Sequence, residues 1–266
     1  MKNTQAFDIS DLLEEYRNKL LTFYAPHFED EKSLTEFVEL AFNYDDKYSQ
    51  VRYMIQQVER FVSLANDIEK IRPVRDPFRI FFLKTCLESL ATIAGFTDKT
   101  KRLFFAEFEN CFSDEGLEYI LSCIEFTGID EPDGLSIRQL AELSVLESQS
   151  LTISSFLNII KAIRDNFAHE GDFWSAQFFA QDTDSIWITS IRTKENIFDI
   201  EKVSWSRIVD YFEQKKVTYF FHTKLDYSKF IFYFVQTCIK FIENKQENLL
   251  DKSSPSTPPQ SCWIGC

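Results

Sequence analysis

The sequence predicts a mainly α-helical protein, a helical bundle that carries one small β-hairpin. Glycine and proline are scarce, with six and seven in 266 residues, and this composition favours long helices over an architecture with many turns. Apolar residues also repeat at helical spacing along most of the chain. Hydrophobic residues make up 44% of the chain and include 28 Phe, which suffices for a substantial core.

Three helices are expected in the N-terminal part. Between residues 8 and 26 apolar and acidic positions alternate at helical spacing, and a proline ends the segment. Ser33 and Glu36 match a capping box, which predicts that a second helix begins at Ser33 and reaches Tyr44. A third helix is expected over residues 45–71, because apolar stripes and charged outer faces continue there.

Two prolines, Pro73 and Pro77, bracket a break after these helices. Since proline interrupts helices, the break predicts a boundary between an N-terminal helical extension, residues 1–74, and a main helical domain, residues 75–247. The end of the chain is polar and rich in proline and serine. We therefore expect a disordered tail over residues 248–266.

The main domain is expected to be built around a helix at residues 78–95 that is apolar almost all round. Glu88 is the only acid in this helix, which indicates either a buried and paired carboxylate or one at the rim of a site. The helix that carries Arg164 and His169 is expected to begin near Ser150. The other helices of the main domain are expected over residues 99–112, 113–126, 137–146, 205–214 and 227–243.

A change of pattern follows the helix that begins near Ser150. Residues 185–191 and 197–203 alternate between apolar and polar positions and contain β-branched residues. A polar turn at residues 193–196 separates them. The sequence therefore predicts a β-hairpin near residues 185–203.

The charge and cysteine content narrow the classes of function. The formal net charge of −13 opposes broad binding to nucleic acid, because such binding depends on a positive field, so any RNA contact must be local. The six cysteines form no Cys-x-x-Cys pair, and we expect reduced thiols and no metal site. The chain shows neither a secretory signal nor a membrane-spanning stretch, so a cytoplasmic location is expected.

Residues 161–172 combine several reactive side chains near a predicted helix end. Arg164 precedes His169 by five positions, and Gly171 is a natural residue to end the helix. Asp165 and His169 are i,i+4 neighbours, so the carboxylate is expected to orient the imidazole. An arginine beside a histidine suits an anionic substrate, above all a phosphodiester.

The stretch Arg164-Asp-Asn-Phe-Ala-His169 resembles the signature of the HEPN superfamily, an arginine followed after four to six residues by a histidine. The polar residue after the arginine, the small Ala168 and the Glu-Gly-Asp that follows add to this resemblance. The predicted hairpin and the closing helix are similar to the plasmid- and phage-defence branches. The resemblance covers residues 77–244, and the N-terminal part lies outside it.

The resemblance implies a metal-independent endoribonuclease without a cofactor, acting on RNA as a toxin or anti-phage effector, with a cognate antitoxin as a further partner. His169 would be the acid and base, Arg164 the phosphate clamp, Asp165 the group that holds the imidazole, and Asn166 a hydrogen-bond donor to phosphate or ribose. The substrate-binding residues expected beside them are Lys161 and Glu88. A homodimer is expected, because two facing motifs supply two histidines.

Two other interpretations remain open. A non-catalytic helical module would use the same groove to bind a nucleotide or a protein partner, which the acidic net charge favours. A purely structural helical protein would instead bury Arg164 and His169 in intramolecular pairs without an open cleft.

Overall fold

The computed structural model describes residues 9–73, 75–172, 176–178 and 187–253. Helices take 67% of the described residues and strands 9%, which confirms the mainly α-helical class. The elements in chain order are α1 (Ile9–Tyr24), η1 (Ala25–His27), α2 (Glu31–Glu39), η2 (Leu40–Phe42), η3 (Asp46–Tyr48), α3 (Ser49–Ile71), α4 (Asp76–Ile93), α5 (Lys101–Glu109), α6 (Asp114–Ser122), β1 (Ile124–Ile129), α7 (Ile137–Glu147), α8 (Ile153–Glu170), β2 (Trp187–Thr193), α9 (Lys202–Val209), β3 (Val217–Thr223) and α10 (Tyr227–Ser253).

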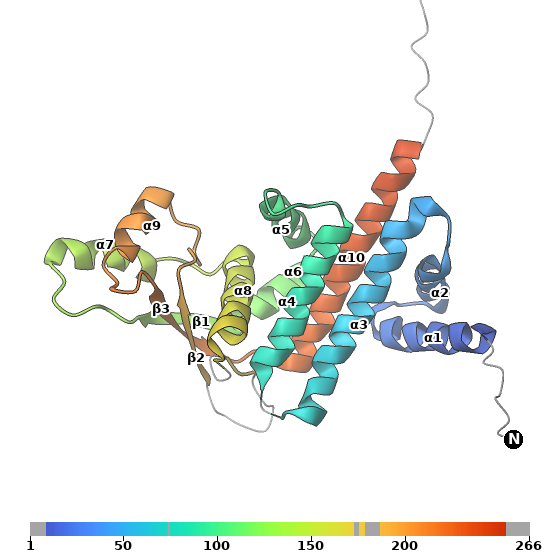
Figure 1. The fold of residues 1–266 in the computed structure, drawn as a ribbon, viewed down its shortest axis with the longest axis horizontal. Helices are drawn as coiled ribbons and strands as arrows, with labels where there is room; N and C mark the ends of the chain where they lie inside the picture. The colour runs from blue at the N-terminus through green and yellow to red at the C-terminus, as the bar shows by residue number, and fades with distance from the viewer. Residues whose placement is uncertain (1–8, 74, 173–175, 179–186, 254–266) are drawn as a thin grey trace, which may run out of the picture.

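The long helices α3, α4 and α10 lie side by side, with α1 and α2 on the outer side of α3 (Figure 1). The sheet lies at the other end of the molecule, beyond α8, together with α7 and α9. Helix α4 packs between α3 and α8, which explains why it is apolar almost all round. The strongly apolar helix predicted over residues 78–95 is therefore confirmed as a central one.

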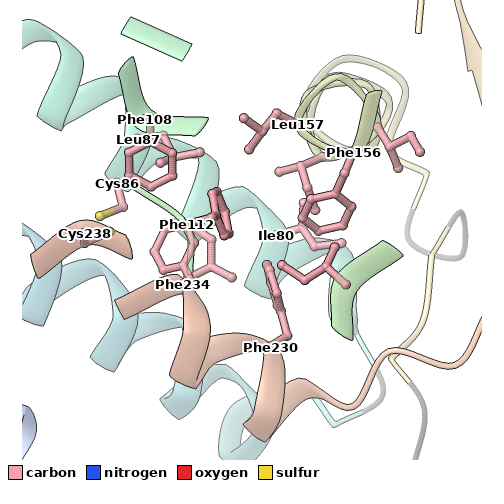
Figure 2. Packing of buried hydrophobic residues seen from close by; sticks show 14 of the residues in the cluster. Ile80, Cys86, Leu87, Phe108, Phe112, Phe156, Leu157, Phe230, Phe234 and Cys238 are labelled. Atoms are coloured by element: carbon pink, nitrogen blue, oxygen red, sulfur yellow. The ribbon is translucent and has the colours of Figure 1, made fainter. Parts of the chain in front are cut away.

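Apolar side chains of α4, α5, α8 and α10 meet in the core, and those of α5, α8 and α10 include aromatic rings (Figure 2). Phe156 of α8 packs edge-on against Phe230 of α10, with ring centroids 5.6 Å apart. Phe108 of α5 lies 6.4 Å from Phe234, one helical turn further along α10. Each buried ring removes a large apolar area from water, so these contacts contribute a large part of the stability of this region.

The start of α2 differs from the capping box predicted at Ser33. Asp30 is the N-cap residue, and its carboxylate accepts a hydrogen bond of 2.8 Å from the backbone N–H of Ser33. The prediction was wrong in position because Asp30, three residues earlier, serves the same capping role, with Ser33 as its donor. The predicted extension to Tyr44 is replaced by the short helix η2 after Glu39.

The predicted hairpin is wrong in its second strand. The three strands form one antiparallel sheet in the order β1-β3-β2, so β2 pairs with β3 and not with residues 197–203. Asn196 instead stabilises a turn, since its side chain donates to the carbonyl of Ile200 and accepts from the N–H of Ile200. Ile197 and Phe198 are buried in this loop, which explains the alternation that resembled a strand.

Two further corrections concern the sheet. Helix α6 ends at Ser122, and residues 124–126, predicted as helical, begin β1. The central strand β3 is not among the predicted elements, although its burial alternates strictly, with Val217, Tyr219 and Phe221 on the inner face.

Helix α10 runs to Ser253, ten residues beyond the predicted end at Glu243. It therefore occupies the first six positions of the tail predicted over residues 248–266, and residues 254–266 lie outside the described part. The domain boundary at residue 74 stays a prediction, and buried residues of both α3 and α4 belong to one hydrophobic cluster. Among the described residues, no helix is long and apolar enough to cross a membrane.

His27 is a half-buried histidine that gives the fold a dependence on pH. Its ring stacks on Phe232 of α10, with centroids 4.9 Å apart, and within the described ranges its Nδ1 has no hydrogen-bond partner. Burial lowers the pKa of His27 from 6.5 to about 4.

We expect the free energy of unfolding to fall as the pH decreases from 6.5 toward 4. In this range His27 binds a proton in the unfolded chain but stays neutral in the folded protein. The contribution is present above pH 6.5 and amounts to roughly 1–2 kcal/mol after allowance for the partial exposure of the ring. Urea titrations at several pH values measure it. His27→Phe should remove this pH dependence of the free energy of unfolding. His222→Gln, a change at a partly exposed histidine, should retain it. The assignment to His27 is wrong if the free energy of unfolding changes with pH equally in His27→Phe and in the parent.

Candidate functional site

Helix α8 carries the Arg164–His169 motif and ends where the sequence predicts. Thr152 caps its start and accepts a hydrogen bond of 3.1 Å from the N–H of Ser155. At the other end Gly171 has a φ of 68°, a left-handed conformation that glycine adopts at little cost. The motif therefore occupies the last two turns of α8.

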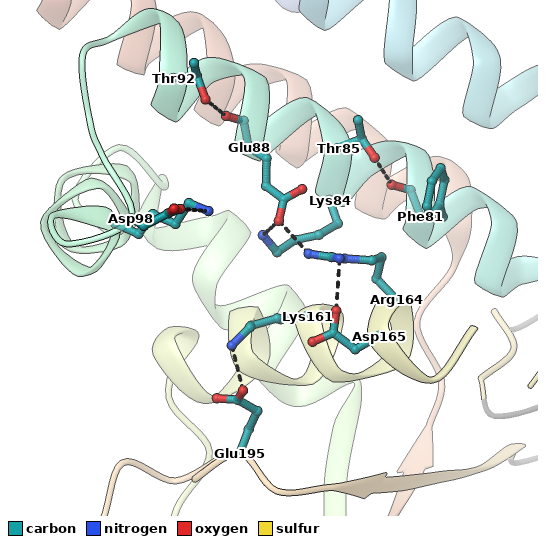
Figure 3. Close-up of polar contacts among 11 residues, drawn as sticks. Phe81, Lys84, Thr85, Glu88, Thr92, Asp98, Lys161, Arg164, Asp165 and Glu195 are labelled. Carbon is teal, nitrogen blue, oxygen red and sulfur yellow. Dashed lines mark hydrogen bonds and ion pairs between the residues drawn. The ribbon is translucent and has the colours of Figure 1, made fainter. Parts of the chain in front are cut away.

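The guanidinium of Arg164 is held between two carboxylates (Figure 3). Its Nη2 lies 2.5 Å from Oε1 of Glu88 on α4, and its Nη1 lies 3.1 Å from Oδ1 of Asp165. Only 20% of the side chain is exposed. The Nε atom is buried without a hydrogen-bond partner in the described part of the chain. Arg164 therefore joins α8 to α4 in the isolated chain.

Lys84, one helical turn before Glu88 on α4, completes this network. Its Nζ donates to the same Oε1 of Glu88 at 3.1 Å, and the lysine is only 2% exposed. Burial lowers the pKa of Lys84. Burial acts to raise the pKa of Glu88, but the charges of Lys84 and Arg164 outweigh it and lower that pKa. Lys84 is absent from the predicted site, although its i,i+4 spacing from Glu88 is readable in the sequence.

The predicted substrate-binding residues therefore have partners within the protein. Glu88 binds Lys84 and Arg164, as the paired alternative for its role anticipates. Lys161 forms an ion pair of 2.9 Å with Glu195, which follows β2 (Figure 3). Both interactions orient side chains of α8 toward neighbouring elements.

His169 differs from the rest of the motif. It lies in the last turn of α8 and is exposed, and no hydrogen bond or ion pair joins its side chain to another described residue. The carboxylate expected to orient it, that of Asp165, pairs with Arg164 instead. Asn166 is buried, with 5% exposure, and its carbonyl accepts from the N–H of Asp172. The motif thus presents an exposed imidazole in the last turn of α8 and, five residues earlier, an arginine paired with two carboxylates.

Comparisons of the chain with protein-family models, with curated proteins and with solved structures found no match. The resemblance to the HEPN superfamily therefore stays a prediction, which depends on the Arg164–His169 motif and is compatible with the helical bundle.

Neither of the two cavities described below is lined by the motif. A small apolar cavity of about 30 Å³ lies between α8 and the sheet, against Ile159, Ile160 and Ile163. A polar cavity of about 360 Å³ lies between α5 and α10, against Cys111 and Lys245. Among the described residues, no cluster of three or more potential metal ligands is present. Neither of these cavities lies at the exposed end of α8, so the motif is a site on the surface of the protein.

Proposed function

We propose that the chain is a HEPN-like, metal-independent endoribonuclease that cleaves RNA by attack of the ribose 2′-hydroxyl, as a toxin or anti-phage effector. The observation that carries the proposal is the free, exposed imidazole of His169 on the same helix end as Arg164, whose guanidinium two carboxylates hold in place. A proton-transfer group beside a cation is what cleavage at a phosphodiester requires.

The histidine supplies the proton chemistry in this proposal. His169 accepts the proton of the 2′-hydroxyl as the bond from O2′ to phosphorus forms, and a second group donates a proton to the departing 5′-oxygen. Since each motif has one histidine, the second group comes from His169 of a second copy across a two-fold axis. A homodimer is therefore part of the proposal.

The arginine has to change partners to bind phosphate. Its contact with Asp165 is the longer of the two ion pairs, 3.1 Å against 2.5 Å for the contact with Glu88. A phosphate oxygen replaces Asp165 at Nη1, while Glu88 continues to hold Nη2 and keeps the guanidinium in position. Glu88 is in this account a positioning residue, supported by Lys84.

Cleavage in the presence of a chelator tests this chemistry. We expect the purified chain to cleave total RNA in EDTA and to leave 2′,3′-cyclic phosphate and 5′-hydroxyl ends, because attack by the 2′-hydroxyl produces these termini without a metal. Phosphatase and kinase treatment followed by end labelling identifies the termini. Loss of cleavage in EDTA, or products with 3′-hydroxyl ends, contradicts the proposal.

A second candidate is a non-catalytic module that binds a nucleotide or a protein partner. It is favoured by the internal pairing of both terminal nitrogens of Arg164 and by the net charge of −13. Expression in cells separates the two candidates. Growth arrest that disappears in the His169→Ala variant excludes the non-catalytic module, whereas arrest of equal strength in both, or in neither, favours it.

A further inference from the structure

The outer face of the sheet is a surface that the proposed catalytic site does not use. The inner face packs against α8, against Phe198 in the loop after β2, and against Trp205 of α9, whose ring stacks with Tyr219 at 6.4 Å. The alternating burial of β3 places Thr218, Phe220 and His222 on the opposite, outer face. On β2 the neighbours of this row include Ile188, which is 65% exposed. One face of the sheet is therefore core and the other meets solvent.

Phe220 stands at the centre of this outer face with small residues on both sides. Its register partners are Ser190 on β2 and Gly128 on β1. Gly128 has a φ of 147° beside an irregularity in the strand, and an added Cβ there would meet no atom within 4 Å. The space beside the Phe220 ring is therefore open.

The ring of Phe220 also takes no part in the aromatic packing of the described residues. In the described part of the chain it contacts no other aromatic ring, and it does not belong to the hydrophobic cluster that includes Tyr219 and Phe221. A partly exposed phenylalanine at a central strand position contributes less to the core than its inward neighbours do. Its face is available for stacking with a flat group.

The charge around the sheet is opposite to that of the whole protein. The net charge of the chain is −13, yet residues 187–194 and 215–224 contain no acid. The cations in these two stretches are Arg192, Lys194, Lys215, Lys216 and Lys224. The row also has acidic neighbours, since Glu125 on β1 lies 3.6 Å from His222, and Asp130, just after β1, donates its backbone N–H to the carbonyl of Thr218. The positive charge is therefore local to β2, β3 and the residues beside them, and it suits an anionic ligand there.

We propose that this sheet face, centred on Phe220, binds single-stranded RNA, with a base stacked on the Phe220 ring and phosphates near Arg192 and the flanking lysines. Exposed bases stack on aromatic side chains, and basic residues follow the backbone. The inference deepens the proposed nuclease and rests on it for the link to cleavage. Glu170, next to His169, pairs with Lys216 at the start of β3, so RNA on the sheet leads toward the motif.

Fluorescence anisotropy with a short labelled oligouridylate tests the proposal. The His169→Ala background keeps the RNA intact if the nuclease is active. We expect Phe220→Ala to weaken binding about tenfold, because the stacked base loses its partner. Ser190→Asp keeps the ring and places a carboxylate beside it, and a comparable loss is expected. Circular dichroism and thermal melting confirm that each variant folds.

Tyr53→Ala is the matched control, since Tyr53 is an exposed aromatic on α3 with Arg52 at 5.0 Å from its ring, away from the sheet. It should bind as the parent does. Unchanged affinity in both Phe220→Ala and Ser190→Asp, equal affinity for duplex RNA, or no binding by the parent overturns the inference. If the protein binds RNA through Phe220 but does not cleave it, the proposed nuclease activity is wrong and the binding surface stands. If the protein cleaves RNA but its affinity does not depend on Phe220, the binding surface is wrong and the nuclease proposal stands.

Discussion

His169→Ala is expected to lower the rate of RNA cleavage by about 10²–10⁴-fold, the usual contribution of a positioned acid or base. The histidine is exposed and has no hydrogen bond or ion pair with another described residue, so its removal should leave the stability of the fold nearly unchanged. A loss of activity in this variant therefore reports chemistry and not unfolding. Single-turnover cleavage of a labelled RNA, followed at saturating enzyme, measures the rate.

Tyr53→Ala is the control for this experiment, because Tyr53 is an exposed residue of α3, away from the motif and from the sheet. Its cleavage rate should stay within a few-fold of the parent at saturating enzyme. Arg164→Ala should also lose activity, but it breaks two ion pairs and requires a stability measurement beside it. Full activity in His169→Ala would exclude the proposed mechanism.

Glu88→Gln is expected to destabilise the protein by roughly 2 kcal/mol at neutral pH, because it leaves the buried ammonium of Lys84 without its carboxylate. The expected loss lies below that of a fully buried pair, since Glu88 is 34% exposed and solvent screens its charge. Urea unfolding of the variant and the parent measures the difference.

The sign of the pH dependence gives a second test of this network. The pKa of folded Lys84 is lowered by burial, so the folded state releases this proton at a lower pH than the unfolded chain does. Stability in Glu88→Gln should therefore recover as the pH rises through the lowered pKa toward the value of the unfolded lysine. A loss that grows with increasing pH would contradict the assignment of the effect to Lys84.

Two variants separate the buried pair from an ordinary ion pair. Lys84→Met in the Glu88→Gln background should restore most of the stability, because it removes the buried charge and keeps an apolar side chain of similar length. Lys32 and Glu36 of α2 form the matched control, since they have the same i,i+4 spacing but are 84% and 68% exposed. Glu36→Gln should cost less than about 0.5 kcal/mol.

The helices could be predicted because their signals are local. The apolar stripes of α4 and α8 extend over 18 residues each, and Gly171 ends α8 by a conformation that its own residue type favours. The sheet could not be predicted in the same way. β3 pairs with residues of β1 that lie 90 to 99 positions earlier, and no short turn joins the two strands to indicate that pairing in the sequence.

The site shows the same division between local and distant information. Arg164, His169 and Glu88 are all readable as unusual residues, and the cation of Arg164 was expected to face a substrate. Its actual partner comes from a helix 76 positions earlier, and the contact with Glu88 brings the guanidinium within reach of Asp165. Helical geometry alone allows Asp165 to approach either Arg164 or His169, so only the packing of α4 on α8 decides between them.

The packing of α10 against α3 has a consequence for how the chain reaches its fold during synthesis. Tyr227, at the start of α10, donates a hydrogen bond to Asn66 of α3, and the two residues are 161 positions apart. Until the last helix has emerged from the ribosome, the face of α3 that α10 covers stays exposed to water and to other chains. The N-terminal helices therefore complete their packing only after α10 has been synthesised. A chain truncated before Tyr227 leaves that apolar face exposed, so it is expected to bind chaperones or to aggregate.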